Sequence, residues 1–246
     1  IAHGRTVRLT NAPAWPPFDI EEADARVGVQ FRLFNDLVVA AAAVPALGSD
    51  DVETLRPGSG VPGGPCLVAT ISTGINDAVV LPPDFGPLRF LAGESGHTPF
   101  APRDEREVDL LQWAWKERGM DFLSFESVLS GGHGFRLLYD YVVATTGLEP
   151  SDGTAGAIAA GSPHAIVLSN AAVRGDDPVA AQVAEMFGAV AGTFIGSRTV
   201  ATVANGGVYL VGGVSHDAPF MRLVAERTAF LERFAAQGVQ SSFVAD

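Results

Sequence analysis

The segment from about residue 178 to residue 203 constrains the fold most, because it is long, apolar and helical in pattern. Pro178 suits the first turn of a helix, where its missing N–H is not needed. Three glycines recur at every fourth position: Gly188, Gly192 and Gly196. This spacing lets a second element approach one face of the helix closely, as it does in membrane dimers. Glu185 and Arg198 lie inside the segment, however, so we expect tight packing in the core of a soluble protein.

Short apolar runs bounded by turn residues predict the strands of an α/β fold. They cover residues 29–34, 66–71, 77–81, 88–91 and 208–211. Ser72-Thr73-Gly74 joins the second run to the third, which predicts a hairpin. Helices are expected over residues 37–44, 104–118, 124–128 and 134–145, and from about residue 219.

The composition excludes several classes of partner. The 246 residues carry a net charge of −12, and Lys116 is the only lysine, so nucleic acid and anionic membrane surfaces are not expected partners. Cys66 is the single cysteine, which rules out an internal disulfide and a multi-cysteine metal site. The longest apolar run, residues 37–47, is shorter than the roughly 20 residues of a bilayer span. We expect a cytoplasmic protein, and Ile1 in place of Met indicates a start that is not natural.

Asn35 and Asp36 follow one predicted strand and precede an alanine-rich helix. A carboxylate at such a junction can project into a cleft and accept a proton from a substrate hydroxyl. Phosphoryl transfer needs little other covalent help from a protein, so one carboxylate base would suffice. The same two residues also fit an ordinary helix cap.

Glu94 and His97 lie in a loop with Gly93 and Gly96, whose backbone freedom lets two polar side chains converge on a small ligand. A carboxylate and an imidazole suit the vicinal hydroxyls of a sugar. An ordinary solvated turn fits as well. No third ligand is near in the sequence, so no protein-bound metal site is expected.

Three further fragments are weak when taken separately. Glu126, on a short apolar helix, can reach a shared pocket, although most helical glutamates are solvated. Ser72-Thr73-Gly74 can bring backbone N–H groups against a phosphate, but any hairpin uses such residues. Gly212-Gly213 allows close approach of a nucleotide or of another backbone. The sequence contains no Walker loop and no Gly-x-Ser-x-Gly elbow, so neither a P-loop enzyme nor a serine hydrolase is supported.

In their order along the chain, these fragments resemble the bacterial glucokinase family of the actin-like/hexokinase superfamily. The matching pieces are Leu9-Thr10-Asn11 with Trp15, Phe34-Asn35-Asp36, Ser72-Thr73-Gly74, Gly93-Glu94-Ser95-Gly96-His97 with Phe100-Ala101-Pro102, Glu126 with Val128-Leu129-Ser130-Gly131, and Gly206-Gly207-Val208 with Gly212-Gly213-Val214. The resemblance implies a ribonuclease-H-like α/β fold. Residues 1–46 would be a remnant of the small domain carrying the catalytic Asp, and residues 47–246 a large domain with the sugar-binding loops.

The resemblance also implies an activity, the ATP-dependent phosphorylation of D-glucose at its 6-hydroxyl to glucose 6-phosphate, the first step of glycolysis. Asp36 would be the general base, and the sugar would be held by Asn35, Asp36, Glu94, His97 and Glu126. ATP, with Mg²⁺ carried on it, would meet Thr73, Gly74, Gly212 and Gly213. Family members are commonly homodimers, so a homodimer is expected.

The chain departs from the family pattern on the phosphate side. The family's opening Asp-x-Gly-Gly-Thr-Asn segment has no equivalent, so we expect the chain to begin within the small domain and to stop before the final helix. The family's phosphate turn, Gly-Thr-Gly-x-Gly, reads Ser72-Thr73-Gly74-Ile75-Asn76 in this chain, and Asp217 stands where the family has a basic residue. An alternative is therefore an impaired sugar-binding or regulatory relative that has lost ATP binding. A third reading is an α/β domain whose motif remnants have no ligand. The hexose and the phosphoryl donor, ATP or polyphosphate, stay open.

Overall fold

The computed structural model describes residues 2–3, 6–8, 14–83, 87 and 89–245. The chain divides into two compact units, Ile1–Asp36 and Leu37–Asp246, and each is described by itself. The prediction that residues 1–46 form a remnant of a small domain stays a prediction.

The first unit holds a small antiparallel sheet and one helix. Its strands β1 (Ala2–His3), β2 (Thr6–Val7) and β3 (Phe18–Asp19) lie in that order. Helix α1 (Ile20–Val27) begins directly after β3, because the Asp19 carboxylate accepts hydrogen bonds from the N–H groups of Glu21 and Glu22 at 2.8 and 3.1 Å.

The predicted strand over residues 29–34 is wrong. This segment has no strand, and its apolar side chains, including Val29, Leu33 and Phe34, are exposed. Apolar and polar residues do alternate there, but a strand needs a hydrogen-bonding neighbour as well as the right pattern. None of the described strands pairs with it.

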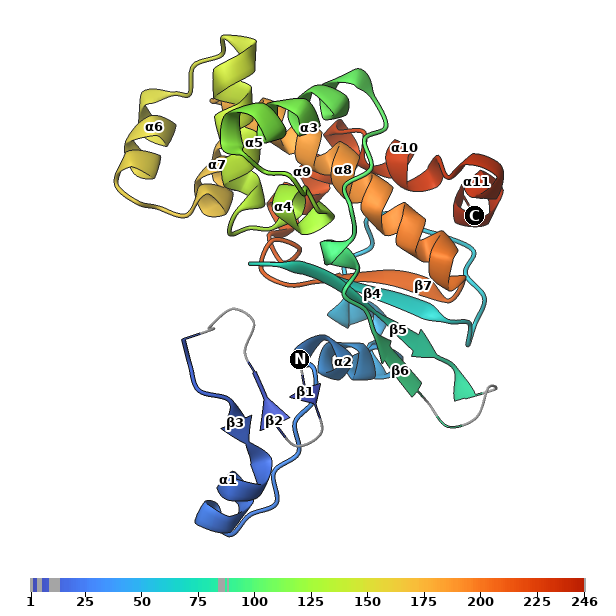
Figure 1. Ribbon diagram of the computed structural model, residues 1–246. Coiled ribbons are helices and arrows are strands. Elements are labelled where there is room, and N and C mark those ends of the chain that lie inside the picture. The colour runs from blue at the N-terminus through green and yellow to red at the C-terminus, as the bar shows by residue number, and fades with distance from the viewer. Residues whose placement is uncertain (1, 4–5, 9–13, 84–86, 88, 246) are drawn as a thin grey trace. The chain divides into compact units, whose positions relative to one another are not determined.

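The second unit is built on a four-stranded sheet with the order β6-β5-β4-β7 (Figure 1). Its strands are β4 (Cys66–Ile71), β5 (Ile75–Leu81), β6 (Arg89–Ala92) and β7 (Gly207–Val211). The predicted hairpin is confirmed, since β4 and β5 pair antiparallel with Ile71 opposite Ile75. Strand β7 pairs parallel with β4, with Leu67 opposite Val208. Because β7 is an edge strand, it is half-buried rather than buried as the apolar run suggested.

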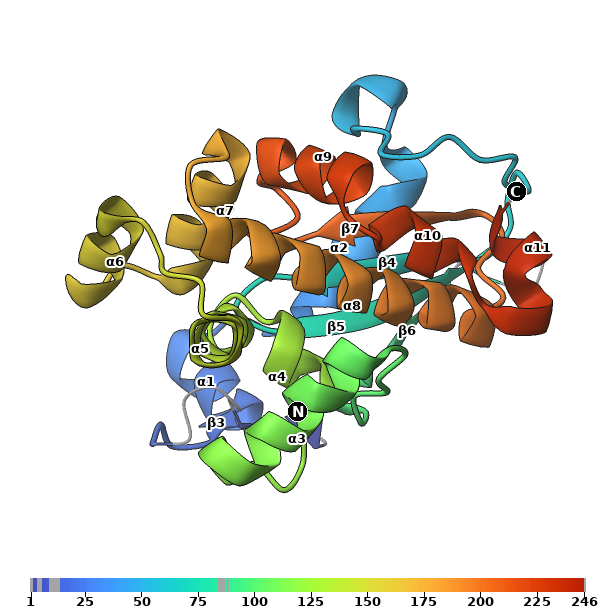
Figure 2. The same ribbon diagram turned by 90° about the horizontal axis from the view of Figure 1, so that it is seen from above.

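Both faces of this sheet are covered, because successive side chains of a strand point to opposite faces. On one face Leu67, Ala69 and Ile71 join the main core beneath α8. On the other face Val68 packs with residues of α2 (Asp36–Ala43), such as Ala41. Figures 1 and 2 show α8 and α2 on opposite sides of the sheet.

Helices make up most of the rest of the second unit. They are α3 (Glu105–Arg118), α4 (Phe125–Leu129), α5 (Gly134–Thr146), α6 (Asp152–Ala159), α7 (His164–Arg174), α8 (Pro178–Thr202), α9 (Ala218–Arg227), α10 (Phe230–Ala235) and α11 (Ser241–Ala245). Single 3₁₀ turns lie at Val44–Ala46, Ser49–Asp51, Ser95–His97 and Gly238–Gln240. The predicted helices are confirmed, with α3, α4 and α8 each beginning after a capping side chain. Helices α6, α7, α10 and α11 were not predicted from the sequence.

Helix α8 is the centre of the core. Among the described residues it is the one helix long and apolar enough to cross a membrane, and most of it is buried inside the protein, as is typical of a core helix. The glycine spacing predicted a close approach, and α10 makes it: Gly192 lies against the Phe230 carbonyl oxygen, and Gly196 against that of Phe234.

Replacing Gly192 by Ala should destabilise the second unit. A Cβ there would stand well inside van der Waals contact with the Phe230 carbonyl oxygen, and α10 would have to move. Overpacking of this kind costs about 1–3 kcal/mol. Gly156→Ala in α6 is the matched control, because a Cβ meets nothing there and the change should be neutral or stabilising by up to about 1 kcal/mol. Urea unfolding measures both, and equal stabilities of the two variants would contradict the packing.

Asp177, the N-cap of α8, makes stability depend on pH. Burial alone would raise the pKa of this carboxyl, but hydrogen bonds from Thr154, from the Ala180 N–H and from Ser151 outweigh it and hold the pKa below its usual range. The Ala180 and Ser151 N–H groups lie 2.8 Å from the carboxylate oxygens. A lowered folded-state pKa stabilises the protein above the unfolded value of about 4, and this stability is lost as the pH falls further.

Asp177→Ala should therefore cost about 1–2 kcal/mol at pH 7, and the difference from the unchanged protein should narrow below about pH 4. Unfolding in urea between pH 7 and pH 2.5 measures this difference. A gap that stays constant over the whole range would show that the charge on Asp177 is irrelevant.

Candidate active site

The turn between β4 and β5 brings together three segments that are far apart in the sequence. The Gly131 N–H donates to the Ser72 carbonyl oxygen at 2.7 Å, and the Val214 N–H donates to that of Ile71 at 3.0 Å. Gly212, with φ of 102°, packs so closely that a Cβ would lie 3.0 Å from that of Ser72. The Gly212-Gly213 pair thus lies against Ile71 and Ser72, which directly precede Thr73 and Gly74 in the chain.

Glu126 lies beside this turn. It stands in the first turn of α4, which Ser124 caps by accepting the Ser127 N–H at 3.2 Å. A Cβ on Gly74 would lie 3.3 Å from the Glu126 carboxylate, so the glycine makes room for that side chain. The side chain is 29% exposed. It therefore remains accessible to a ligand, although it sits on an otherwise apolar helix.

His97 lies between two carboxylates. Its Nε2 is 3.6 Å from Oε2 of Glu126 and 3.9 Å from Oε2 of Glu94. The side chains of His97 and Glu94 are 59% and 57% exposed. The structure thus brings together the three predicted sugar-binding residues of the second unit. Two acceptors flanking an imidazole can bind several adjacent hydroxyls.

The backbone between these residues holds them in place. The Phe125 N–H donates to the Thr98 carbonyl oxygen at 3.2 Å, and the Phe100 N–H donates to that of Leu123 at 2.8 Å. These bonds tie the segment after His97 to the start of α4. The distance between His97 and Glu126 is therefore set by backbone pairing and not by their side chains alone.

Sequence reasoning missed the residues that support the Glu94 loop. Asn76 donates from Nδ2 to the Glu94 carboxylate. Its other amide atom, Oδ1, is buried and has no hydrogen-bond partner among the described residues. Asp77 is 1% exposed and contacts Ser95 and Arg198. The sequence feature that could have indicated this support is the pair of adjacent polar residues, Asn76 and Asp77, at the start of a buried strand.

Asn35 and Asp36 belong to the first unit, and Asp36 is also the first residue of α2. Their predicted roles, as sugar ligand and as general base, stay predictions. Asp217, the predicted charge reversal, is the N-cap of α9, where its carboxylate accepts the Phe220 N–H at 3.2 Å. This capping role accounts for an acidic residue at that position without any nucleotide.

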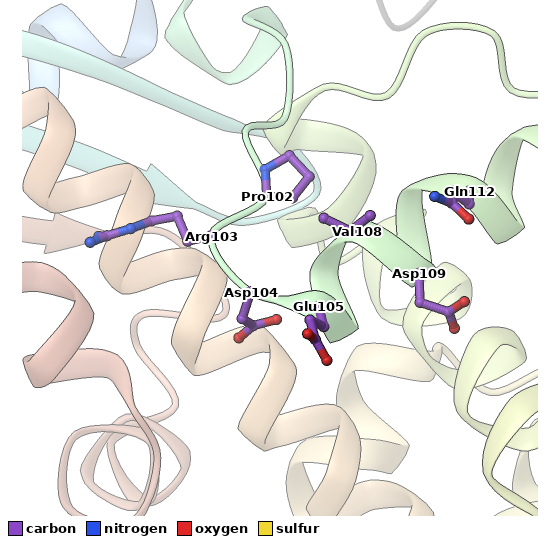
Figure 3. A pocket seen from close by; sticks show the side chains of 7 residues that line it. All are labelled: Pro102, Arg103, Asp104, Glu105, Val108, Asp109 and Gln112. Atoms are coloured by element: carbon purple, nitrogen blue, oxygen red, sulfur yellow. The ribbon is translucent and has the colours of Figure 1, made fainter.

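Metal binding finds no support in the described parts of the chain, where no group of three or more His, Cys, Asp or Glu could hold an ion. A pocket of about 580 Å³ lies elsewhere, at the start of α3 (Figure 3). It is lined by Pro102, Arg103, Asp104, Glu105, Val108, Asp109 and Gln112, whose side chains spread apart rather than converge.

Several polar groups of this pocket already have structural partners. Arg103 donates to the Ala236 carbonyl oxygen at 2.6 Å, and Asp104 pairs with Arg233. Asp109 accepts the Tyr141 hydroxyl at 2.9 Å, which together with burial raises the pKa of Tyr141 to about 12. The pocket is therefore a weaker candidate than the Glu94 loop.

Comparison with solved structures identifies the fold class of the protein. A ROK family glucokinase from Streptomyces griseus, solved in complex with glucose and AMPPNP, superposes with a TM-score of 0.56 at 18% identity, covering 88% of this chain and 61% of that one. A ROK hexokinase from Thermus thermophilus gives a TM-score of 0.53 at 21% identity, covering 92% of this chain and 66% of that one. This likeness shows the ribonuclease-H-like, actin-like ATPase fold of sugar kinases, and the predicted fold class is confirmed.

The family follows from closer matches. The glucokinase family profile matches residues 2–246. A glucokinase of Chromobacterium violaceum is 31% identical over 245 residues, which are 99% of this chain and 65% of that protein. The crystal structure of a glucokinase from an Antarctic psychrotroph superposes with a TM-score of 0.76 at 26% identity, covering 99% of this chain and 70% of that one. The chain belongs to the glucokinase family and spans about two thirds of the length of such relatives.

Proposed function

We propose that the protein is a glucokinase that transfers the terminal phosphoryl group of ATP to the 6-hydroxyl of D-glucose. The observation that carries this proposal is the placement of His97 between the carboxylates of Glu94 and Glu126, in a chain of the glucokinase family. The reaction gives glucose 6-phosphate and ADP. We also expect a cytoplasmic homodimer, as the family resemblance implies.

The sugar is recognised by side chains that accept and donate hydrogen bonds. Glu94 and Glu126 accept from sugar hydroxyls, and His97 bonds a hydroxyl between them. Asn35 and Asp36 complete the set in this proposal. The Streptomyces griseus relative was solved with glucose, which supports glucose as the first ligand to test.

Asp36 is proposed as the general base. It takes the proton from the 6-hydroxyl while that oxygen forms a bond to the γ-phosphorus and the bond from this phosphorus to the β-phosphate oxygen breaks. The protein otherwise supplies position and charge stabilisation, which are the main protein contributions to phosphoryl transfer.

ATP is proposed to lie along the turn formed by Thr73, Gly74, Gly212 and Gly213. The fit rests on the close packing of two glycine-containing segments: Gly212 has a positive φ, and a Cβ there would clash with the Thr70 hydroxyl and the Ile71 carbonyl oxygen, so glycine lets this segment lie directly against the β4–β5 turn. Peptide N–H groups in such turns can bind phosphate oxygens. Mg²⁺ accompanies the ATP phosphates and neutralises charge on them.

Titration calorimetry with D-glucose tests the sugar site. Glu94→Gln should weaken binding about tenfold or more, because a hydrogen bond to a charged group is lost. Glu117→Gln, at an exposed position of α3, is the control and should bind as the unchanged chain does. Absence of glucose binding by the folded, unchanged chain would contradict the proposal.

Asp36→Asn tests the base. Turnover, measured as glucose-dependent ADP formation with Mg²⁺, should fall by about 10²–10⁴-fold, because the proton acceptor is lost, while glucose affinity is retained. Asp50→Asn serves as the control at an exposed carboxylate. Normal turnover in Asp36→Asn would refute the assignment. Glucose binding without any turnover in the unchanged chain would favour the sugar-binding relative that has lost ATP binding.

A further inference from the structure

Asp77 is an unusual residue for the middle of a sheet. It lies on β5 opposite Ala69 and is 1% exposed, on the same face as Ile75 and Val79 of the main core. Burying an ionised carboxylate costs several kcal/mol unless charges and hydrogen bonds compensate it. Its partners therefore show what the buried charge does.

The two oxygens of Asp77 bind different parts of the protein. Oδ2 accepts from Arg198 of α8, whose Nε and terminal nitrogen lie at 3.1 and 3.0 Å. Oδ1 accepts the Ser95 hydroxyl. A single carboxylate thus bridges the core helix and the loop that carries Glu94 and His97.

The backbone of the loop also lies directly on β5. The Gly93 N–H donates to the Asp77 carbonyl oxygen at 2.8 Å, and a Cβ on Gly93 would stand 2.5 Å from Oδ1 of Asp77. Gly96 lies closer still to the Ile75 carbonyl oxygen. The neighbour of Asp77, Asn76, holds the Glu94 carboxylate. Two successive strand residues thus hold two successive loop residues.

We propose that Arg198, acting through Asp77, is a positioning residue for the loop Gly93–His97. A positioning residue is needed because the side chains of Glu94 and His97 are more than half exposed, so packing against neighbours does not set their directions. Apart from the Asn76 hydrogen bond to Glu94, their directions depend on the loop backbone, which the Ser95–Asp77–Arg198 contacts hold together with the backbone bond from Gly93 to Asp77. An effect of Arg198 on sugar binding rests on the proposed function.

Hydrogen exchange of the 246-residue chain without sugar tests the anchoring directly. In Arg198→Gln, the amides of residues 93–98 should exchange at least about tenfold faster, while β4 keeps its protection. Arg198→Lys should restore part of the protection, because it keeps the charge but loses the guanidinium fork. Arg118→Gln is the matched control, since it breaks the 2.7 Å pair between α3 and Asp140 of α5 and should leave the loop unchanged.

A second variant covers the case in which Arg198→Gln does not fold. Asp77→Leu combined with Arg198→Met removes both charges, so no unpaired buried charge remains, yet Ser95 still loses its acceptor. The loop should again exchange faster within a protected core. Unchanged exchange of residues 93–98 in whichever of these variants folds would overturn the proposal.

Glucose affinity separates this proposal from the proposed function. If the unchanged chain binds glucose, Arg198→Gln should weaken binding by about tenfold and Arg118→Gln should not. A loosened loop with unchanged affinity would refute the positioning role. If the unchanged chain binds no glucose, the proposed function fails, and the exchange experiment still decides whether Arg198 anchors the loop.

Discussion

The pairing of β4 with β5 is the interaction on which the second unit depends. Its two faces carry both apolar clusters, one beneath α8 and one against α2. The segments around Gly131 and Gly212 pack against the turn of this hairpin, and β5 binds the Glu94 loop through Asn76 and Asp77. Because β4 and β5 are the two central strands of the sheet, each is hydrogen-bonded to a neighbour on both sides, and groups attached to them keep their spacing. The candidate site is therefore held mainly by backbone contacts to this hairpin, and its side chains project from segments that these contacts fix.

Much of this architecture could be predicted, and the exceptions have physical causes. Helices α3, α5 and α8 show their apolar spacing and caps locally, and the hairpin shows its turn between two apolar runs. The segment 29–34 has the alternation of a strand but pairs with no described strand. Whether a segment finds a pairing partner cannot be predicted from its own residues. Asp77 and Arg198 are 121 residues apart, so their contact could not be read from the sequence. The motif residues Glu94, His97 and Glu126 were predicted from the family resemblance, and the structure adds that the His97 imidazole lies 3.6 Å from the Glu126 carboxylate and 3.9 Å from that of Glu94.

Two residues that depart from the family pattern have structural roles in the second unit. Asp217 caps α9, so its acidic side chain has a structural use. Asn76, the last residue of the altered turn, donates to the Glu94 carboxylate, so this residue also has a structural use. Arg198 and Asp77 extend the same support into the core helix. The loop that carries Glu94 and His97 is thus supported by Asn76, Asp77 and Arg198.

The most direct test of the central claim, that Glu94, His97 and Glu126 form one sugar-binding group, is NMR of the histidine imidazole nitrogens. The chain has five histidines, so each signal can be assigned by single substitution. Adding D-glucose should shift the His97 signals, leave His164 of α7 unchanged, and have no effect on His97 in Glu126→Gln; L-glucose should shift neither. His97 signals that ignore D-glucose, or that respond equally to both enantiomers, would contradict the claim.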